Sequence, residues 1–208
     1  MVDTILGRKI GMTQVFNDRG EVVPVSVIEA GPCIVTQLKS VLKDGYTAVQ
    51  VGFGEIRPKL VTKPKKGQFK SSGVTPTRYL REIRTEDTSS YKLGDAINCG
   101  IFVPGMRVKV TGISKGKGFQ GVVKRYHWHG GDMGHGSMVH RKPQSSGATD
   151  AARTFKGTGK PGHMGSCQVT MRGIRVVRVD PVKNLLLLEG PVPGVEGALI
   201  TIQSLKQR

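Results

Sequence analysis

The sequence has almost no branched aliphatic residues over one long segment near its middle. Residues 126–168 contain Val139 as their only valine, leucine or isoleucine, alongside nine glycines and five histidines. So few apolar side chains cannot offset the entropy lost when 43 residues become ordered. We therefore expect this segment to lie outside the hydrophobic core and to obtain a fixed structure from a partner.

Acidic residues are also scarce, and this scarcity indicates the kind of partner. The 208 residues include 32 Lys and Arg against 15 Asp and Glu, which gives a formal net charge of +17. Residues 96–179 hold 14 of these cations and two aspartates. Such a block repels itself unless a polyanion neutralises it. Glycine and serine separate the charges, with no amphipathic apolar face, so the pattern favours nucleic acid over a membrane surface or a merely solvated basic surface.

Paired cysteines and long hydrophobic runs are absent as well. Cys33, Cys99 and Cys167 are widely spaced and odd in number, which argues against a disulfide framework and for a reducing compartment. The longest hydrophobic run is residues 185–188, and the first eleven residues lack a signal-peptide core. We therefore expect a cytoplasmic protein without a targeting or membrane-spanning segment.

What the sequence does contain, at both ends, is a series of short runs rich in valine and isoleucine, separated by turn residues. They predict strands at residues 12–16, 22–29, 33–38, 46–52, 96–103, 107–113, 169–179, 185–189 and 198–205. Strands of this length and spacing are typical of an antiparallel barrel or sandwich. The closing strands find apolar partners only on the N-terminal ones. We therefore predict a mainly β fold in which residues 1–125 and 169–208 form one β-barrel domain, with residues 126–168 as an irregular arm rich in glycine and basic residues.

Residues 57–90 interrupt the strand pattern. The part from 57 to 72 has five lysines and an arginine, no acidic residue, and only three large apolar residues. We interpret residues 57–90 as a basic excursion from the barrel, with short helices, that contacts the same polyanion. One of these short turns of helix is predicted at residues 79–84.

A glycine–lysine run, Ser114-Lys-Gly-Lys-Gly118, precedes the arm. Glycines let backbone N–H groups converge on an oxyanion while lysines neutralise it. The nucleotide-binding consensus G-x-x-x-x-G-K-[ST] is not present. We interpret the run, together with Arg125 and a short helix predicted between residues 118 and 125, as a contact for a nucleic-acid backbone.

The five histidines raise metal binding and catalysis as alternatives. His135 and His140 have an H-x₄-H spacing, but no cysteine pair accompanies them, which disfavours zinc. Ser145 and Ser146 near His140 resemble a nucleophile and base, yet no strand–turn–helix context supports that arrangement. A ribonuclease or RNA-modifying enzyme is therefore the runner-up interpretation, and we predict no catalytic residue, metal or cofactor.

The predicted RNA contacts are cations that neutralise phosphates, and aromatic or histidine side chains that stack on unpaired bases. Each histidine taken singly is equally compatible with a satisfied surface residue. The predicted contacts are Lys115, Lys117, Lys124, Arg125, Tyr126, His127, Trp128, His129, His140, Arg141, Lys142, Arg153, Lys156 and Lys160.

Ordered motifs run through almost the whole chain. They are Gly7-Arg-Lys-Ile-Gly-Met-Thr13, Val61-Thr-Lys-Pro64, Thr111-Gly-Ile-Ser-Lys-Gly-Lys-Gly-Phe119, Lys124-Arg125, His135-Gly-Ser137, His140-Arg141, Phe155-Lys-Gly157, Met164-Gly165, Val176-Val-Arg-Val-Asp180, Asn184-Leu-Leu-Leu187 and Val192-Pro-Gly194. In this order they resemble the bacterial large-subunit ribosomal protein L-three family. The resemblance implies a translation-protein-like β-barrel, direct binding to large-subunit (23S) rRNA and an early role in subunit assembly. It also implies neighbours from the L-fourteen and L-nineteen families, and neither a membrane nor a small-molecule substrate.

The resemblance further implies that the arm tip approaches the peptidyl transferase centre. The tip residues are Pro143, Gln144, Ser145, Ser146, Gly147, Ala148, Thr149 and Asp150. Some family members carry a methylated glutamine in a Gly-Gln-Asn-Gln-like stretch there, whereas this chain has Gly147-Ala-Thr-Asp150 and no glutamine to modify. Lys109 replaces the family's usual acidic or amide residue before the glycine–lysine run, which adds charge.

Overall fold

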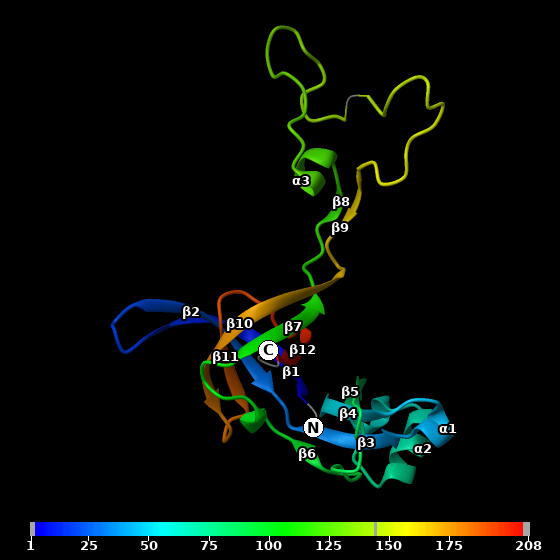
Figure 1. The fold of residues 1–208 in the computed structure, drawn as a ribbon, viewed down its shortest axis with the longest axis vertical. Helices are drawn as coiled ribbons and strands as arrows, with labels where there is room; N and C mark the ends of the chain where they lie inside the picture. The colour runs from blue at the N-terminus through cyan, green and yellow to red at the C-terminus, as the bar shows by residue number, and fades with distance from the viewer. Residues whose placement is uncertain (1–2, 144, 206–208) are drawn as a thin grey trace. The chain divides into compact units, whose positions relative to one another are not determined.

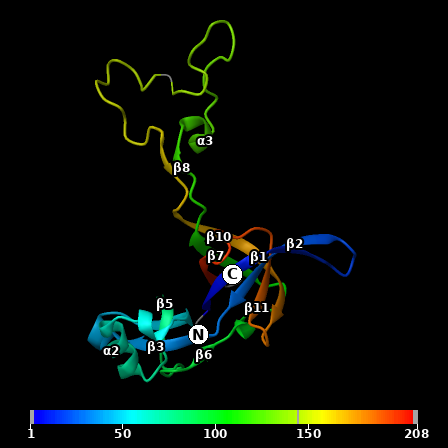
Figure 2. The ribbon, with the colours of Figure 1, turned by 180° about the vertical axis from the view of Figure 1, so that it is seen from behind.

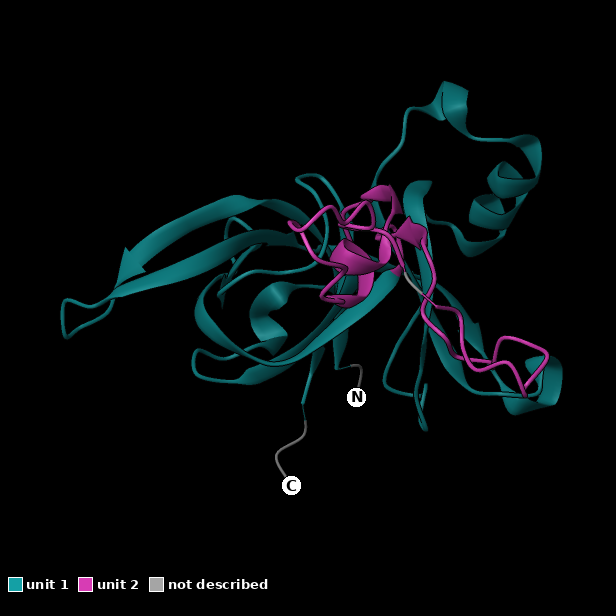
Figure 3. Cartoon of the chain, turned by 90° about the horizontal axis from the view of Figure 1, so that it is seen from above, with its two compact units in different colours: residues 1–113, 168–208 teal, residues 114–167 magenta. Residues whose placement is uncertain are grey.

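The computed structural model describes residues 3–143 and 145–205, and their contacts divide the chain into two compact units. Unit 1 comprises residues 1–113 and 168–208, and unit 2 comprises residues 114–167 (Figure 3). Unit 2 therefore begins twelve residues before the predicted start of the arm at Tyr126. In the described chain no helix is long and apolar enough to cross a bilayer.

Strands from both ends of the sequence form a closed antiparallel barrel in unit 1, in the order β1-β12-β7-β10-β11-β2 (Figure 1). Thr4 pairs with Gln203 and Arg8 with Leu199, so the first and last strands are neighbours. The closing strands thus pack on the N-terminal ones, as their lack of other apolar partners led us to expect. The barrel strands are β1 (Thr4–Phe16), β2 (Val22–Ala30), β7 (Arg107–Ile113), β10 (Gln168–Asp180), β11 (Leu185–Glu189) and β12 (Leu199–Ser204).

A second sheet of unit 1 has the strand order β5-β4-β3-β6. Its strands are β3 (Cys33–Lys39), β4 (Ala48–Glu55), β5 (Thr77–Arg84) and β6 (Ala96–Ile97). The prediction of a helical turn at residues 79–84 is wrong, because Tyr79 and Ile83 pair with Phe53 and Val49 of β4 as part of a strand. The mainly β fold is confirmed, and residues 33–38 and 46–52 are strands, but they lie in this sheet and outside the barrel.

One hydrophobic core joins the barrel to the second sheet. Alternate residues of most strands, which share one face, supply it, while β1 buries the consecutive residues Ile5 and Leu6. Ile5, Leu6 and Ile28 come from the barrel, while Val35 and Val49 come from the sheet, and all five are fully buried. Burial of each such side chain contributes on the order of 1.5–3 kcal/mol, so the two sheets stabilise each other as a single unit.

The Gly7-Arg-Lys9 motif helps to close the barrel. A Cβ on Gly7 would lie 2.7 Å from the carbonyl oxygen of Glu29, so only glycine lets β1 approach β2 this closely. The buried Lys9 amine donates to the carbonyl oxygens of Val192 and Gly194, at 3.1 and 3.3 Å. The motif therefore ties β1 to the loop before β12, which is a structural role.

The helices are short. α2 (Lys63–Ser72) falls in the predicted basic excursion, buries only Phe69, and ends at Gly73 in the left-handed conformation with φ 66°. The others are α1 (Val41–Asp44), α3 (Val122–Tyr126) and the 3₁₀ turns Pro58–Leu60 and Cys99–Ile101.

All three cysteines are free, and burial raises the pKa of the Cys33 thiol to about 12.

Candidate nucleic-acid interface

A short antiparallel ladder holds the two ends of unit 2 together. β8 (Gly118–Gln120) pairs with β9 (Gly162–Met164), with Gly118 opposite Met164. The Ser114 N–H donates to the Cys167 carbonyl and the Lys117 N–H to the Met164 carbonyl, both at 2.9 Å. The glycine–lysine run therefore uses two of its five backbone N–H groups, those of Ser114 and Lys117, to hold the ends of unit 2 together next to the ladder, and these two are not free to bind an oxyanion.

A cluster of aromatic and cationic side chains packs next to this ladder. The Arg125 guanidinium donates to the Lys160 carbonyl at 2.7 Å and lies 5.0 Å from the centroid of the Tyr126 ring. A Cβ on Gly159 would lie 2.9 Å from Tyr126 and 3.3 Å from Trp128, so both rings pack directly on this glycine. We call Arg125, Tyr126, Trp128, Gly159 and Lys160 the stem cluster. It joins the two halves of unit 2 without a core of branched aliphatic residues.

Three predicted RNA contacts thus have structural roles inside unit 2. Arg125 is half-buried and bonded to backbone, whereas Tyr126 and Trp128 keep 44% and 38% of their surface exposed. The rings can still stack on a base with that exposed surface. The only sequence signal for this packing is the closely spaced glycines at 157, 159 and 162, which do not show which residues meet there.

His140 and the neighbouring serines are engaged in local turns. The Gly131 N–H donates to the His140 carbonyl at 2.7 Å, which closes a loop, and the imidazole Nδ1 lies 3.2 Å from the Met133 sulfur. Ser145 bonds to the backbone of Gly147, and Ser146 accepts from the Lys160 amine at 2.6 Å. The serine–histidine pair that the enzyme interpretation requires is therefore not formed.

Metal-binding geometry is likewise missing from the described residues, where no group of three His, Cys, Asp or Glu side chains could hold an ion. Of the predicted arm-tip residues, Ser145 to Asp150 are exposed and Pro143 is half-buried. Gln144 lies outside the described residues. The tip therefore presents polar side chains and backbone at the surface of unit 2.

A shallow hollow of about 460 Å³ gathers several of the predicted contacts. His127, Trp128, His129 and Lys142 line it. Rings for stacking beside a cation for a phosphate are the groups that recognise an unpaired nucleotide. Of the predicted sites, this one is the most fully assembled in the structure; Val122, Gly130, Pro143 and Ser145 complete its lining.

Most cations of unit 2 have no protein partner. Unit 2 contains nine Lys and Arg and two Asp, and in its described part none of these cations forms an ion pair. Arg153 instead stacks on Phe155 at 5.1 Å. The side chains of six cations are exposed and make neither an ion pair nor a hydrogen bond to another described residue. They are Lys115, Lys117, Lys124, Arg141, Lys142 and Lys156.

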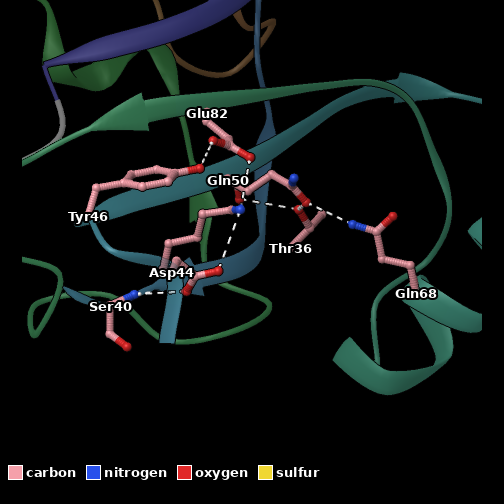
Figure 4. A network of polar contacts seen from close by, with 8 residues as sticks. Thr36, Ser40, Asp44, Tyr46, Gln50, Gln68 and Glu82 are labelled. Carbon is pink, nitrogen blue, oxygen red and sulfur yellow. Dashed lines mark hydrogen bonds and ion pairs between the residues drawn. The ribbon is translucent and has the colours of Figure 1, made fainter. Parts of the chain in front are cut away.

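Unit 1, unlike the described part of unit 2, contains cations with carboxylate partners. Figure 4 shows one such polar network. The Lys39 amine lies 3.6 Å from Asp44 and 3.4 Å from Glu82, and the Tyr46 hydroxyl donates to Glu82 at 2.8 Å. Hydrogen bonding to Tyr46 first, and then to Lys39, holds the pKa of the Glu82 carboxyl below its usual value. Hydrogen bonding to Tyr46, and then to Glu82, raises the pKa of Lys39.

A second cationic surface lies on α2, within the basic excursion that we predicted to contact the polyanion, although none of its residues was among the individually predicted contacts. Lys63, Lys65, Lys66 and Lys70 of α2 are exposed and form no ion pair with any described residue. The sequence signal was present, because residues 57–72 contain six cations and no acidic residue. A cationic helix of this kind is a second surface suited to phosphates.

A β domain, a cationic segment without internal ion pairs, and a hollow lined by rings are together typical of nucleic-acid-binding proteins. Residues 95–186 match the family model for Ribosomal protein L3. The Large ribosomal subunit protein uL3 of Carboxydothermus hydrogenoformans is 53% identical over 199 residues, which cover 96% of this chain and 95% of that protein. Its counterpart from Heliobacterium modesticaldum is 52% identical over 200 residues, again 96% and 95%. The chain belongs to the ribosomal protein L3 family.

Proposed function

We propose that this chain is a structural constituent of the large ribosomal subunit and binds its 23S rRNA directly through unit 2. The family consists of ribosomal proteins, so the chain is not an enzyme and acts in the cytoplasm. The observation that carries the proposal is the set of unit 2 cations that form no ion pair with any described residue. Exposed, unpaired Lys and Arg gain most from phosphates, because binding releases the counterions that surround RNA.

The proposal includes two kinds of RNA contact. Lys115, Lys117 and Lys124 near the ladder, with Arg141 and Lys156 farther along the chain, neutralise phosphates and fix the position of unit 2 on the RNA. The hollow around Trp128 takes an unpaired base, which stacks on its rings. The stem cluster holds these groups in place before RNA arrives.

The family resemblance supports a finer proposal. The chain nucleates subunit assembly as a translation-protein-like barrel, its neighbours belong to the L-fourteen and L-nineteen families, and residues 143–150 approach the peptidyl transferase centre. Exposed polar side chains at 145–150 are compatible with close approach to RNA. Substitutions there should leave subunit sedimentation intact while shifting sensitivity to inhibitors of peptidyl transfer.

The salt dependence of binding to 23S rRNA fragments tests the direct contact. We expect a log–log slope on the order of −5 or steeper for the unchanged protein, and a slope shallower by about three for the variant K115Q/K117Q/K124Q. The matched control K43Q/K92Q/K183Q removes three exposed lysines from unit 1 and should retain the full slope. Equal slopes for the two triple variants would show that unit 2 does not hold the phosphates.

A further inference from the structure

The strands β1 and β2 extend beyond the barrel that they help to build. β12 pairs with β1 only at residues 4–8, and β11 pairs with β2 only at residues 25–29. β1 and β2 nevertheless stay paired with each other out to Phe16 and Val22. We call residues 10–24 the β1–β2 ribbon; it projects from the barrel as the blue hairpin of Figures 1 and 2.

One face of the ribbon is apolar and exposed. Phe16 lies opposite Val22, and Gln14 lies opposite Pro24, so these four side chains and Met12 share a face. The exposed fractions of Met12, Phe16 and Val22 are 50%, 68% and 53%. This face carries no charged residue, and contiguous exposed apolar side chains mark interaction sites.

The outer edge of β1 is open along the ribbon. Lys9 is the last residue with a partner on that side, through Ala198 and Gly197; for residues 11–16 the described chain provides only β2, on the opposite side. Their sequence, Gly-Met-Thr-Gln-Val-Phe, lacks the lysine or proline that usually blocks an exposed edge. The edge of β2 is protected, because Pro24 lies there and accepts a hydrogen bond from Gly190. A strand from another chain could therefore add to β1 alone.

The charge of the ribbon argues against RNA as the occupant. Residues 10–24 contain Arg19, Asp18 and Glu21, a net charge of −1 in a chain of net charge +17. Phosphates are held by cations, and this surface offers one arginine at its turn. The two carboxylates at the turn instead favour a partner that carries Lys or Arg.

We propose that the β1–β2 ribbon is the docking site for a neighbouring protein of the large subunit. An extended segment of that protein pairs with the open edge of β1 and covers Met12 and Phe16 with apolar side chains. Its Lys or Arg residues face Asp18 and Glu21. This inference rests on the proposed function, because it requires the chain to be part of the subunit.

A photocrosslinking experiment in purified large subunits tests the occupant. Phe16 is replaced by p-benzoylphenylalanine, and crosslinked peptides are identified by mass spectrometry. The expected product joins this position to one ribosomal protein, in a segment that alternates apolar residues and has Lys or Arg near one end. Crosslinks confined to rRNA, crosslinks to a second copy of this chain, or none at all in subunits that contain the chain would overturn the proposal. Failure of the chain to sediment with large subunits would instead refute the proposed function itself.

A pair of matched double variants tests the energetic role of the apolar face. The affinity of the M12Q/F16S variant for the ribosomal protein identified by crosslinking, measured with both proteins purified, should be at least about tenfold lower. The reason is that buried apolar anchors dominate such interfaces. The control L42Q/V182S makes the same polar replacements at two apolar side chains that are 98% and 90% exposed elsewhere in unit 1, and should bind like the unchanged protein. Thermal unfolding of both variants checks that they fold. Equal affinity of the two double variants would contradict the docking role.

Discussion

Units 1 and 2 belong to one chain but differ in whether any of their cations has a carboxylate partner among the described residues; in unit 1 three cations have one, while others, such as the lysines of α2, have none. In unit 1, Arg8 pairs with Glu29 at 2.7 Å, Arg175 pairs with Glu189 at 2.8 Å, and Lys39 lies between two carboxylates. In the described part of unit 2 no cation has a carboxylate partner. Unit 1 can therefore be stable by its own contacts, whereas unit 2 is left with charge that an external polyanion neutralises.

The two units also differ in what holds them together. Unit 1 has a shared core of aliphatic residues from two sheets, while Val122 is the only fully buried apolar residue among the described residues of unit 2. The composition of residues 126–168 led us to expect that their structure would come from a partner. The ladder between β8 and β9 and the stem cluster show that one end of unit 2 has contacts of its own. We expect the partner to be needed for the remainder, where the hydrogen bonds are those of turns and a few longer contacts such as that between Lys160 and Ser146.

The largest effect that we expect comes from removing unit 2. Ile113 and Gln168 are paired neighbours in β7 and β10, so residues 114–167 can be replaced by a short Gly-Ser turn between them. We expect the shortened chain to unfold cooperatively with β-type circular dichroism, because the core cluster is untouched. Its affinity for 23S rRNA fragments should fall at least about a hundredfold, since nine cations are lost. Loss of the thermal transition would show that unit 2 contributes to the stability of unit 1.

Replacing Gly159 by valine should disturb unit 2 and leave unit 1 intact. The added side chain meets Tyr126 and Trp128 at distances where the rings must move. Trp128 is the only tryptophan, so its fluorescence reports on unit 2 alone. We expect a changed emission spectrum, faster proteolysis within residues 114–167 and rRNA binding weakened by about tenfold, with the thermal transition of unit 1 unchanged.

Gly134→Ala is the matched control for this variant, because a Cβ there meets no atom within 4 Å. It should behave like the unchanged protein in all three measurements. If Gly159→Val and Gly134→Ala were indistinguishable, the stem cluster would not organise unit 2, and its structure would come entirely from the RNA.

How much of this could be predicted from the sequence depends on the distance over which residues interact. The strands at 107–113 and 185–189 were predictable from local sequence, the first because Val108 and Val110 alternate with polar residues and the second because four leucines form a short apolar run bounded by turn residues. The assignment of 33–38 and 46–52 to a separate sheet was not, because strand pairing is decided by segments far apart in the chain. The helical turn expected at 79–84 failed for the same reason: pairing with β4 overrode a weak local pattern.

The candidate site shows the same division. The excess of cations in unit 2 is visible in the composition and predicts a nucleic-acid partner, whereas the ordered motifs along the chain led to the family. The role of Arg125 was not visible, because its bond to the Lys160 carbonyl joins residues 35 positions apart. Gly7 and Lys9 carried the family resemblance, yet the structure gives them a role in closing the barrel.

The smallest effect that we expect concerns the paired charges of unit 1. Tyr46→Phe removes the hydroxyl that donates to Glu82 while it keeps the ring that Lys39 and Arg84 approach at 5.3 Å.

The pKa of Glu82 is lowered in the folded protein, so this group contributes stability above the unfolded-state pKa of about 4.3 and loses it as the pH falls through the lower folded value. The network is largely exposed, which limits the fall in Tm at pH 7 to about 3 °C or less. The difference between variant and unchanged protein should shrink as the pH falls below the unfolded-state value and through the lower folded value. Tyr79→Phe is the control, because the Tyr79 hydroxyl bonds to no described residue, and its Tm difference should not depend on pH. A Tyr46→Phe difference that stays constant from pH 7 to pH 3 would mean that the ion-paired character of unit 1 does not contribute to its stability.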